Sequence, residues 1–164
     1  MNLVDGFISY IEAERRYSPL TVRNYRRDIA DFLEFIGVDK ERFDPNAIAR
    51  ADVEEWIVYL FEKRKLKAQS VNRSVATLRS FWKWMLGHGH ANRDIVSVIS
   101  QAKTPSRLPV FVSESRMKDV VKSLRLDIAS EDFERLRDAI IILLFYTAGL
   151  RLAELSNLKI GDIS

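Results

Sequence analysis

Apolar residues recur three and four positions apart along most of the chain, which is the spacing of a helix with one buried face. This spacing predicts helices over residues 3–15, 18–36, 52–61 and 69–86, with a short fifth helix over residues 94–99. No alternating, strand-like pattern appears before residue 159. The first hundred residues are therefore expected to form a bundle of four or five helices, and the chain as a whole to be all-α.

The ends of these helices carry residues that commonly start or stop a helix. Ser18, followed by proline, has the pattern of an N-cap with a proline in the first turn. Asp52 is expected to cap the third helix in the same way. Gly37 is expected to end the second helix, and Gly87 with Gly89 to end the fourth.

The periodicity breaks at residues 103–112, which contain two prolines. We interpret this stretch as a linker between two domains, residues 1–102 and residues 113–164. Residues 159–163 leave two alternatives open, the beginning of a strand or an irregular tail.

Two further helices are expected after the linker. Ser113 is expected to start the first of them, which runs to about Leu124. Ser130 with Asp132 is expected to start the second, which ends near Ala148.

Composition and charge exclude several classes of protein. The chain is 47% hydrophobic and 30% charged, which is typical of a folded protein rather than a disordered one. Its longest apolar run, residues 139–146, is far shorter than the roughly twenty residues of a membrane helix. Acidic residues at positions 5, 12 and 14 argue against a signal peptide, and the absence of cysteine excludes disulfides and thiol chemistry. We expect a cytoplasmic protein.

One long stretch of the chain carries charge of a single sign. Residues 63–93 contain eight lysines and arginines and no aspartate or glutamate. Such a block indicates an anionic partner, because a solvated surface normally mixes both signs. A basic surface without any ligand explains the block equally well, so charge alone does not decide.

The outward faces of two helices have an unusual composition. The second helix turns Arg23, Asn24 and Arg27 away from its apolar stripe. On such faces small residues allow close approach, and Arg or Gln can bond base edges in a major groove, although ordinary surface positions explain the same pattern. The face opposite the core of residues 69–86 consists of Gln69, Arg73, Ala76 and Ser80, with Thr77 and Lys83 at its edges.

An arginine and a glutamate stand where an apolar helix ends and another begins. Gly149 is expected to end the helix, and Arg151 and Glu154 follow three residues apart on one face. A guanidinium offers paired donors that match phosphate oxygens, and it can stabilise the charge that builds during phosphoryl transfer. The alternative is a simple salt bridge at a helix start, which contributes little where it is exposed.

Three stretches resemble the tyrosine recombinases of the phage integrase and Xer type. SPLTVRNYRRD (residues 18–28) and QSVNRSVATLRSF (residues 69–81) resemble the core-binding domain of that family, and LLFYTAGLRLAEL (residues 143–155) resembles its first catalytic box. The resemblance implies a SAM-like core-binding bundle of four or five helices, followed by the first helices of a mixed α/β catalytic domain. In such a bundle the second and fourth helices lie against the DNA major groove.

The resemblance also implies roles for individual residues. Arg151 corresponds to the arginine that grips the scissile phosphate, and Glu154 to the acid that supports it. The implied partners are double-stranded DNA and further recombinase subunits, assembled as a tetramer by the full-length enzyme. The candidate DNA-binding residues are Thr21, Arg23, Asn24, Arg27, Gln69, Ser70, Arg73, Thr77 and Lys83.

The full enzyme of such a family cleaves DNA through a 3′-phosphotyrosyl link, which conserves bond energy and implies no cofactor. None of the five tyrosines stands at the nucleophile position of the family, so these 164 residues are expected to bind DNA without cutting it. His88 and His90 lack nearby carboxylates and do not predict a metal site.

Two alternatives remain open at this point. One is a stand-alone DNA-binding or regulatory protein that never cleaves. The other is a helical interaction domain whose basic block meets an acidic partner. The sequence leaves open the DNA target and the choice between chromosome-dimer resolution and integration of mobile DNA.

Overall fold

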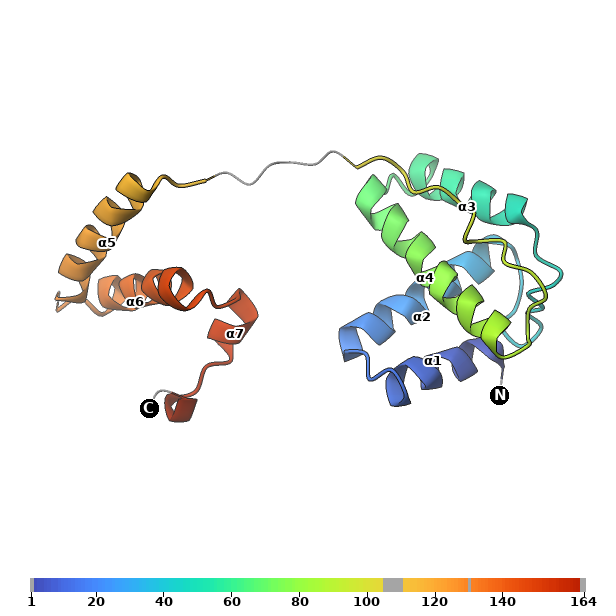
Figure 1. Ribbon diagram of the computed structural model, residues 1–164, viewed down its shortest axis with the longest axis horizontal. Coiled ribbons are helices and arrows are strands. Elements are labelled where there is room, and N and C mark those ends of the chain that lie inside the picture. Colours follow the sequence, from blue (N-terminus) through green and yellow to red (C-terminus); the bar gives the residue numbers. More distant parts are fainter. Residues whose placement is uncertain (1, 105–110, 130, 163–164) are drawn as a thin grey trace. The chain divides into compact units, whose positions relative to one another are not determined.

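A computed structural model describes residues 2–104, 111–129 and 131–162, and its regular elements are helices throughout (Figure 1). The chain divides into two compact units, residues 1–106 and residues 107–164. The prediction of an all-α chain is confirmed for the described residues. Most of the predicted linker, together with Ser130 as a helix start and the last residue of the 159–163 segment, lies outside them.

The first unit is a bundle of four helices. These are α1 (Leu3–Ala13), α2 (Pro19–Phe35), α3 (Arg50–Glu62) and α4 (Ala68–Gly87). Helix α4 is the centre of the bundle, because α1, α2 and α3 all pack against it, while α1 also packs against α2. The contact between α2 and α4 brings residues of these two helices together at one place in the bundle.

The boundaries of α2 follow the prediction. The Ser18 hydroxyl accepts a hydrogen bond from the Thr21 N–H at 3.2 Å, which satisfies one of the free donors at the helix start. Gly37 follows the helix with a φ of +66°, a conformation that glycine adopts without strain.

The predicted start of α3 is wrong by three residues. The N-cap is Ala49, and Asp52 lies inside the first turn. The Asp52 carboxylate reaches back to accept a hydrogen bond from the Ala49 N–H at 2.7 Å. Asp52 thus stabilises the helix start from the third helical position, as the acidic member of a capping box does.

The predicted fifth helix over residues 94–99 is also wrong. This segment forms turns, in which Asp94 Oδ1 accepts hydrogen bonds from the N–H groups of Val96 and Ser97 at 3.0 and 2.9 Å. Three of its apolar residues, Ile95, Val96 and Ile99, are nevertheless buried, whereas Val98 is exposed. The segment therefore contributes to the core as a closely packed loop, and the bundle has four helices.

Aromatic side chains fill the centre of the first unit. Trp56 and Trp82 are both 0% exposed, and Phe32 lies between them with ring centroids 5.3 and 6.4 Å away. Phe7 and Phe81 extend this cluster toward α1, with ring centroids 5.0 Å apart. Such rings bury large apolar areas and fix the distances between the helices.

The second unit is smaller and has little core of its own. It contains α5 (Glu114–Ile128), α6 (Phe133–Ala148), α7 (Leu152–Ser156) and a 3₁₀ turn (Ile160–Asp162). Helix α5 packs against α6, yet Leu124 and Ala139 are the buried apolar side chains among the described residues of this unit. Large apolar side chains on α6 remain exposed instead: Phe133, Ile140, Ile142 and Tyr146.

The ends of α6 agree with the prediction. The Asp132 side chain caps the helix start by accepting a hydrogen bond from the Glu134 N–H at 2.9 Å. Gly149 ends the helix with a φ of +62°, and its N–H donates to the Phe145 carbonyl. No helix in the described parts of the chain is both long and apolar enough to cross a membrane.

Candidate nucleic-acid interface

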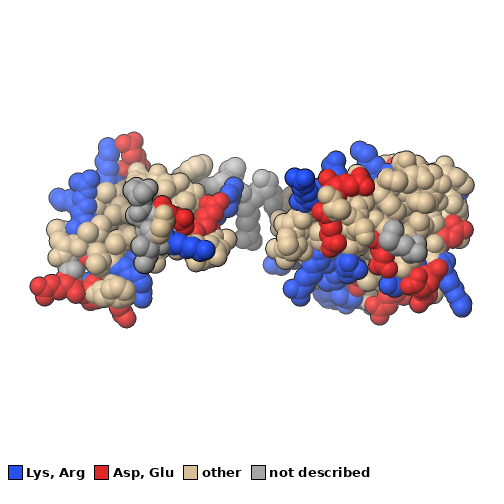
Figure 2. Space-filling model, turned by 90° about the horizontal axis from the view of Figure 1, so that it is seen from below, with Lys and Arg blue, Asp and Glu red and all other residues tan. Residues whose placement is uncertain are grey.

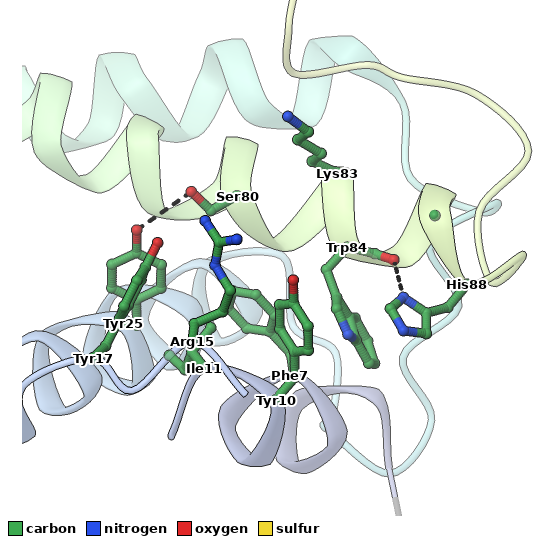
Figure 3. A pocket seen from close by; sticks show the side chains of 11 residues that line it. Phe7, Tyr10, Ile11, Arg15, Tyr17, Tyr25, Ser80, Lys83, Trp84 and His88 are labelled. Atoms are coloured by element: carbon green, nitrogen blue, oxygen red, sulfur yellow. Dashed lines mark hydrogen bonds between the residues drawn. The ribbon is translucent and has the colours of Figure 1, made fainter. Parts of the chain in front are cut away.

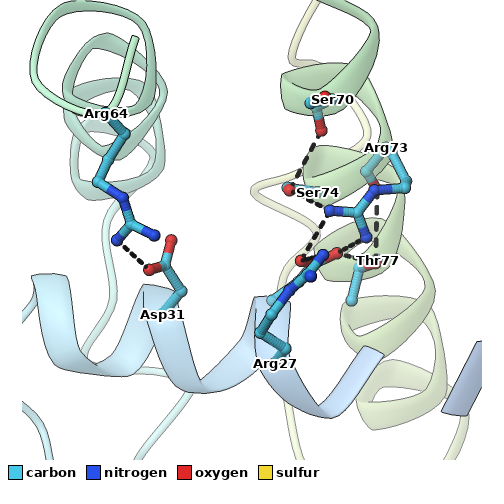
Figure 4. A network of polar contacts seen from close by, with 8 residues as sticks. Arg27, Asp31, Arg64, Ser70, Arg73, Ser74 and Thr77 are labelled. Atoms are coloured by element: carbon cyan, nitrogen blue, oxygen red, sulfur yellow. Dashed lines mark hydrogen bonds and ion pairs between the residues drawn. The ribbon is translucent and has the colours of Figure 1, made fainter. Parts of the chain in front are cut away.

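Two arginines meet one buried carboxylate where α2 packs against α4 (Figure 4). Asp28 of α2 is only 4% exposed and accepts hydrogen bonds from Arg73 Nη1 at 2.6 Å and Arg73 Nη2 at 3.1 Å. Arg27 Nη2 lies 3.5 Å from the same carboxylate. The structure therefore brings Arg27 and Arg73 together, and their side chains remain 64% and 40% exposed.

Thr77 does not occupy its predicted place on the outward edge of α4. It is 2% exposed, and its hydroxyl donates to Asp28 Oδ2 at 3.0 Å. The packing of α2 against α4 covers this position, so the predicted outward placement of Thr77 is wrong. The threonine instead helps to satisfy the buried carboxylate, which would otherwise be costly to bury.

The other candidates on α2 and at the start of α4 lie at or near the surface. Arg23 and Gln69 are exposed, whereas Thr21, Asn24 and Ser70 are half-buried. The Thr21 hydroxyl is 2.8 Å from the N-cap hydroxyl of α2 and takes part in the capping of that helix. These five positions remain predicted contacts.

Lys83 stands apart from the arginine pair. It follows Arg73 by nearly three turns of α4, about 15 Å along the helix axis. It lies at the rim of a groove of about 350 Å³ that α1 and α4 enclose with aromatic side chains, among them Tyr10 and Trp84. Figure 3 shows Lys83 pointing away from these rings. Lys83 is thus exposed and lies apart from the Arg27 and Arg73 pair.

Charges of both signs occur on the face of each unit that Figure 2 shows. On this face of each unit, clusters of Lys and Arg side chains alternate with clusters of Asp and Glu. Some of the basic side chains also bind acidic ones, as Arg64 does with Asp31 at 2.7 Å. Specific side chains on α2 and α4 therefore define the candidate interface better than total charge does.

The two predicted catalytic residues are in contact at the start of α7. Arg151 is the N-cap residue, and its N–H donates to Glu154 Oε2 at 2.8 Å. Its Nη1 donates to Glu154 Oε1 at 2.7 Å. The backbone hydrogen bond, followed by the side-chain one, lowers the pKa of Glu154 below its ordinary value.

This geometry leaves Arg151 available to a ligand. Its side chain is 84% exposed, and Glu154 occupies only one of its guanidinium nitrogens. A guanidinium has five N–H donors, so the rest remain for phosphate oxygens. The pair can therefore present an oriented cation to an anionic group.

Asp28 is the site residue that sequence reasoning did not single out. A signal for it exists, since position 28 falls among the apolar positions 22, 25, 29 and 32 that α2 turns toward the core. An acidic residue on a buried helix face requires a partner. That partner, Arg73, lies 45 positions away, beyond the reach of local periodicity.

Comparison with known proteins gives a consistent result for the first unit. Residues 4–89 match the family described as "Phage integrase, N-terminal SAM-like domain". Tyrosine recombinase XerD of Listeria monocytogenes is 31% identical over 162 residues, which cover 99% of this chain and 53% of that protein. Tyrosine recombinase XerD of Rickettsia bellii is 29% identical over 163 residues, with coverages of 99% and 52%. The chain thus spans about half the length of these curated relatives.

A solved structure shares the fold. The Tn1549 transposon integrase, solved in complex with circular intermediate DNA, matches 100% of this chain and 51% of its own, with a TM-score of 0.61 at 14% identity. The region that matches the family covers more than half of the chain and extends across all four helices of the bundle. The chain therefore belongs to the phage integrase family, the tyrosine recombinases, through its N-terminal SAM-like domain.

Proposed function

We propose that this chain is the DNA-binding portion of a site-specific tyrosine recombinase and that it holds duplex DNA with the face formed by α2 and α4. One observation carries the proposal: Arg27 and Arg73 converge on Asp28 at the contact between these helices. Two guanidinium groups and one carboxylate leave a net positive charge at this point. Guanidinium groups bind phosphate oxygens and guanine edges through paired, planar hydrogen bonds.

The relatives support duplex DNA as the partner. The XerD proteins are named as tyrosine recombinases, and the Tn1549 integrase was solved with DNA. In the complete enzyme, Arg151 would hold the scissile phosphate while Glu154 orients it. A tyrosine outside these 164 residues would form the 3′-phosphotyrosyl link, within a tetramer on DNA and in the cytoplasm.

Binding of the chain to labelled duplex DNA at several salt concentrations tests this proposal. Neutralised phosphates release counterions, so the logarithm of the affinity should fall linearly with the logarithm of the salt concentration. The Arg27→Ala variant should reduce the steepness by about one unit if Arg27 binds a phosphate. The Arg73→Ala variant should weaken binding to a preferred sequence by about 1–3 kcal/mol if Arg73 reads a base edge.

Arg50→Ala is the matched control, because it removes the same charge from α3, where Arg50 is paired with Glu54 at 2.7 Å. It should change neither quantity appreciably. Binding that is independent of salt, or equally sensitive to Arg50→Ala and Arg73→Ala, would contradict the proposed interface.

A further inference from the structure

Asp28 is placed to control the orientation of Arg73. Its carboxylate is buried between α2 and α4 and receives hydrogen bonds from both terminal nitrogens of Arg73 and from the Thr77 hydroxyl. Paired hydrogen bonds of this kind fix both the position and the plane of a guanidinium. The Ser74 hydroxyl adds a longer contact with Arg73 Nη2 at 3.5 Å.

The fixed guanidinium still has donors to offer. Within residues 2–104, the contacts of Arg73 with Asp28 and Ser74 involve only its Nη1 and Nη2 atoms. The Nε–H group and one N–H of Nη1 remain for an anionic or carbonyl ligand. The Arg73 side chain as a whole is 40% exposed, so it reaches the surface of the bundle.

We infer that Asp28 is a positioning residue, which holds Arg73 in one orientation for its contact with DNA. This inference rests on the proposed function. A flexible surface arginine loses rotational freedom when it binds, whereas an arginine that is already held loses less. Asp28 would thus strengthen DNA binding although its own charge repels DNA.

The sign of one substitution separates this role from simple electrostatics. Removal of a carboxylate beside a DNA-binding surface ordinarily strengthens binding, because the net positive charge rises. If Asp28 positions Arg73, the Asp28→Asn variant should instead bind a preferred duplex more weakly, by about three- to tenfold. Its affinity for unrelated duplexes should be unchanged or higher.

The chain contains a matched control one turn further along α2. Asp31 binds Arg64 Nη1 at 2.7 Å, and Asp31→Asn removes the same charge from the same helix without touching Arg73 (Figure 4). This variant should bind the preferred duplex as tightly as the unsubstituted chain, or more tightly. In the Arg73→Ala background, Asp28→Asn should lose most of its effect on preferred binding, because only the longer contact of Asp28 with Arg27, at 3.5 Å, remains.

The probes are a 30-base-pair duplex selected from a random pool for binding to the unsubstituted chain, and the unselected pool itself. Failure of the unsubstituted chain to bind either probe would overturn the proposed function, and this inference with it. A different outcome would overturn only the inference about Asp28. In that outcome the unsubstituted chain binds DNA, and the Asp28→Asn variant binds the selected duplex equally tightly or more tightly.

A second measurement avoids the risk that Asp28→Asn unfolds. Nitrogen-15 NMR of the unsubstituted chain reports whether the Arg73 guanidinium rotates freely. Restricted rotation both before and after addition of the selected duplex is expected. Free rotation before addition, or loss of the Asp28 contact in the complex, would overturn the inference.

Discussion

The Glu154 carboxylate accepts two hydrogen bonds from Arg151, one from the backbone N–H at 2.8 Å and one from the guanidinium at 2.7 Å. The first of these hydrogen bonds stabilises the start of α7, and the second orients an exposed cation. One carboxylate therefore couples the beginning of a short helix to the direction of the side chain that precedes it. A change in the charge of Glu154 is expected to affect both.

The pKa of Glu154 should be measurably low in the folded chain. The hydrogen bonds lower this pKa because they favour the charged carboxylate. They therefore stabilise the start of α7 fully at pH values above the ordinary pKa of glutamate. This stabilisation is lost as the pH falls through the lowered value. Carbon-13 NMR titration of the Glu154 carboxyl should show the low midpoint. In Arg151→Ala the midpoint should rise only part of the way, because the backbone hydrogen bond is the larger cause.

Arg151 should matter for DNA cleavage and not for folding. In a longer form of the protein that cleaves DNA, Arg151→Ala should lower the cleavage rate about 10²–10³-fold, by analogy with the loss of an oxyanion-site donor. Arg151→Lys should restore little, because it keeps the charge but loses the paired geometry. Arg125→Ala, which removes an exposed arginine from α5, serves as the control. A folded Arg151→Lys protein with normal cleavage would refute the assignment.

Loss of a central aromatic side chain should strongly destabilise the first unit. Trp82 is 0% exposed, so Trp82→Ala should reduce the free energy of unfolding by about 3–5 kcal/mol. Val58→Ala on α3 is the control, because Val58 is 51% exposed and its loss should change the free energy by less than about 0.5 kcal/mol. Urea denaturation followed by circular dichroism measures both. Similar midpoints for the two variants would contradict the described core.

The second unit should open more readily than the first. Its described residues bury two apolar side chains, Leu124 and Ala139, whereas α6 exposes Ile140 and Ile142. Amide hydrogen exchange should therefore be faster across residues 114–162 than across α1 to α4. Uniform protection of both units, in a sample that light scattering shows to be monomeric, would contradict this expectation.

Local patterns predicted most of the helices because each helix start and buried stripe is a short-range feature. Ser18, Gly37 and Gly149 act over a few residues, and all three end or start helices as expected. The predicted N-cap of α3 is wrong because an aspartate at the N-cap and one inside the first turn look alike in sequence. The predicted helix over residues 94–99 is wrong because buried apolar residues in a tight loop can have the same spacing as those of one helical turn.

The candidate site was less predictable, because its geometry depends on contacts between distant segments. The helical periodicity of residues 69–86 predicts that Arg73 faces outward, but the carboxylate that holds Arg73 comes from α2. The same packing covers Thr77, which the periodicity places at the edge of the outward face. By contrast, Arg151 and Glu154 lie three residues apart, so their contact was accessible from spacing alone.

The placement of tryptophan gives the first unit an optical signal of its own. The three tryptophans of the chain, Trp56, Trp82 and Trp84, all belong to the first unit, at its core or against it. Intrinsic fluorescence excited at the red edge of tryptophan absorption therefore reports on the helical bundle alone. Far-ultraviolet circular dichroism reports on both units. A difference between the two unfolding curves would measure, without any label, how independently the two halves of the chain fold.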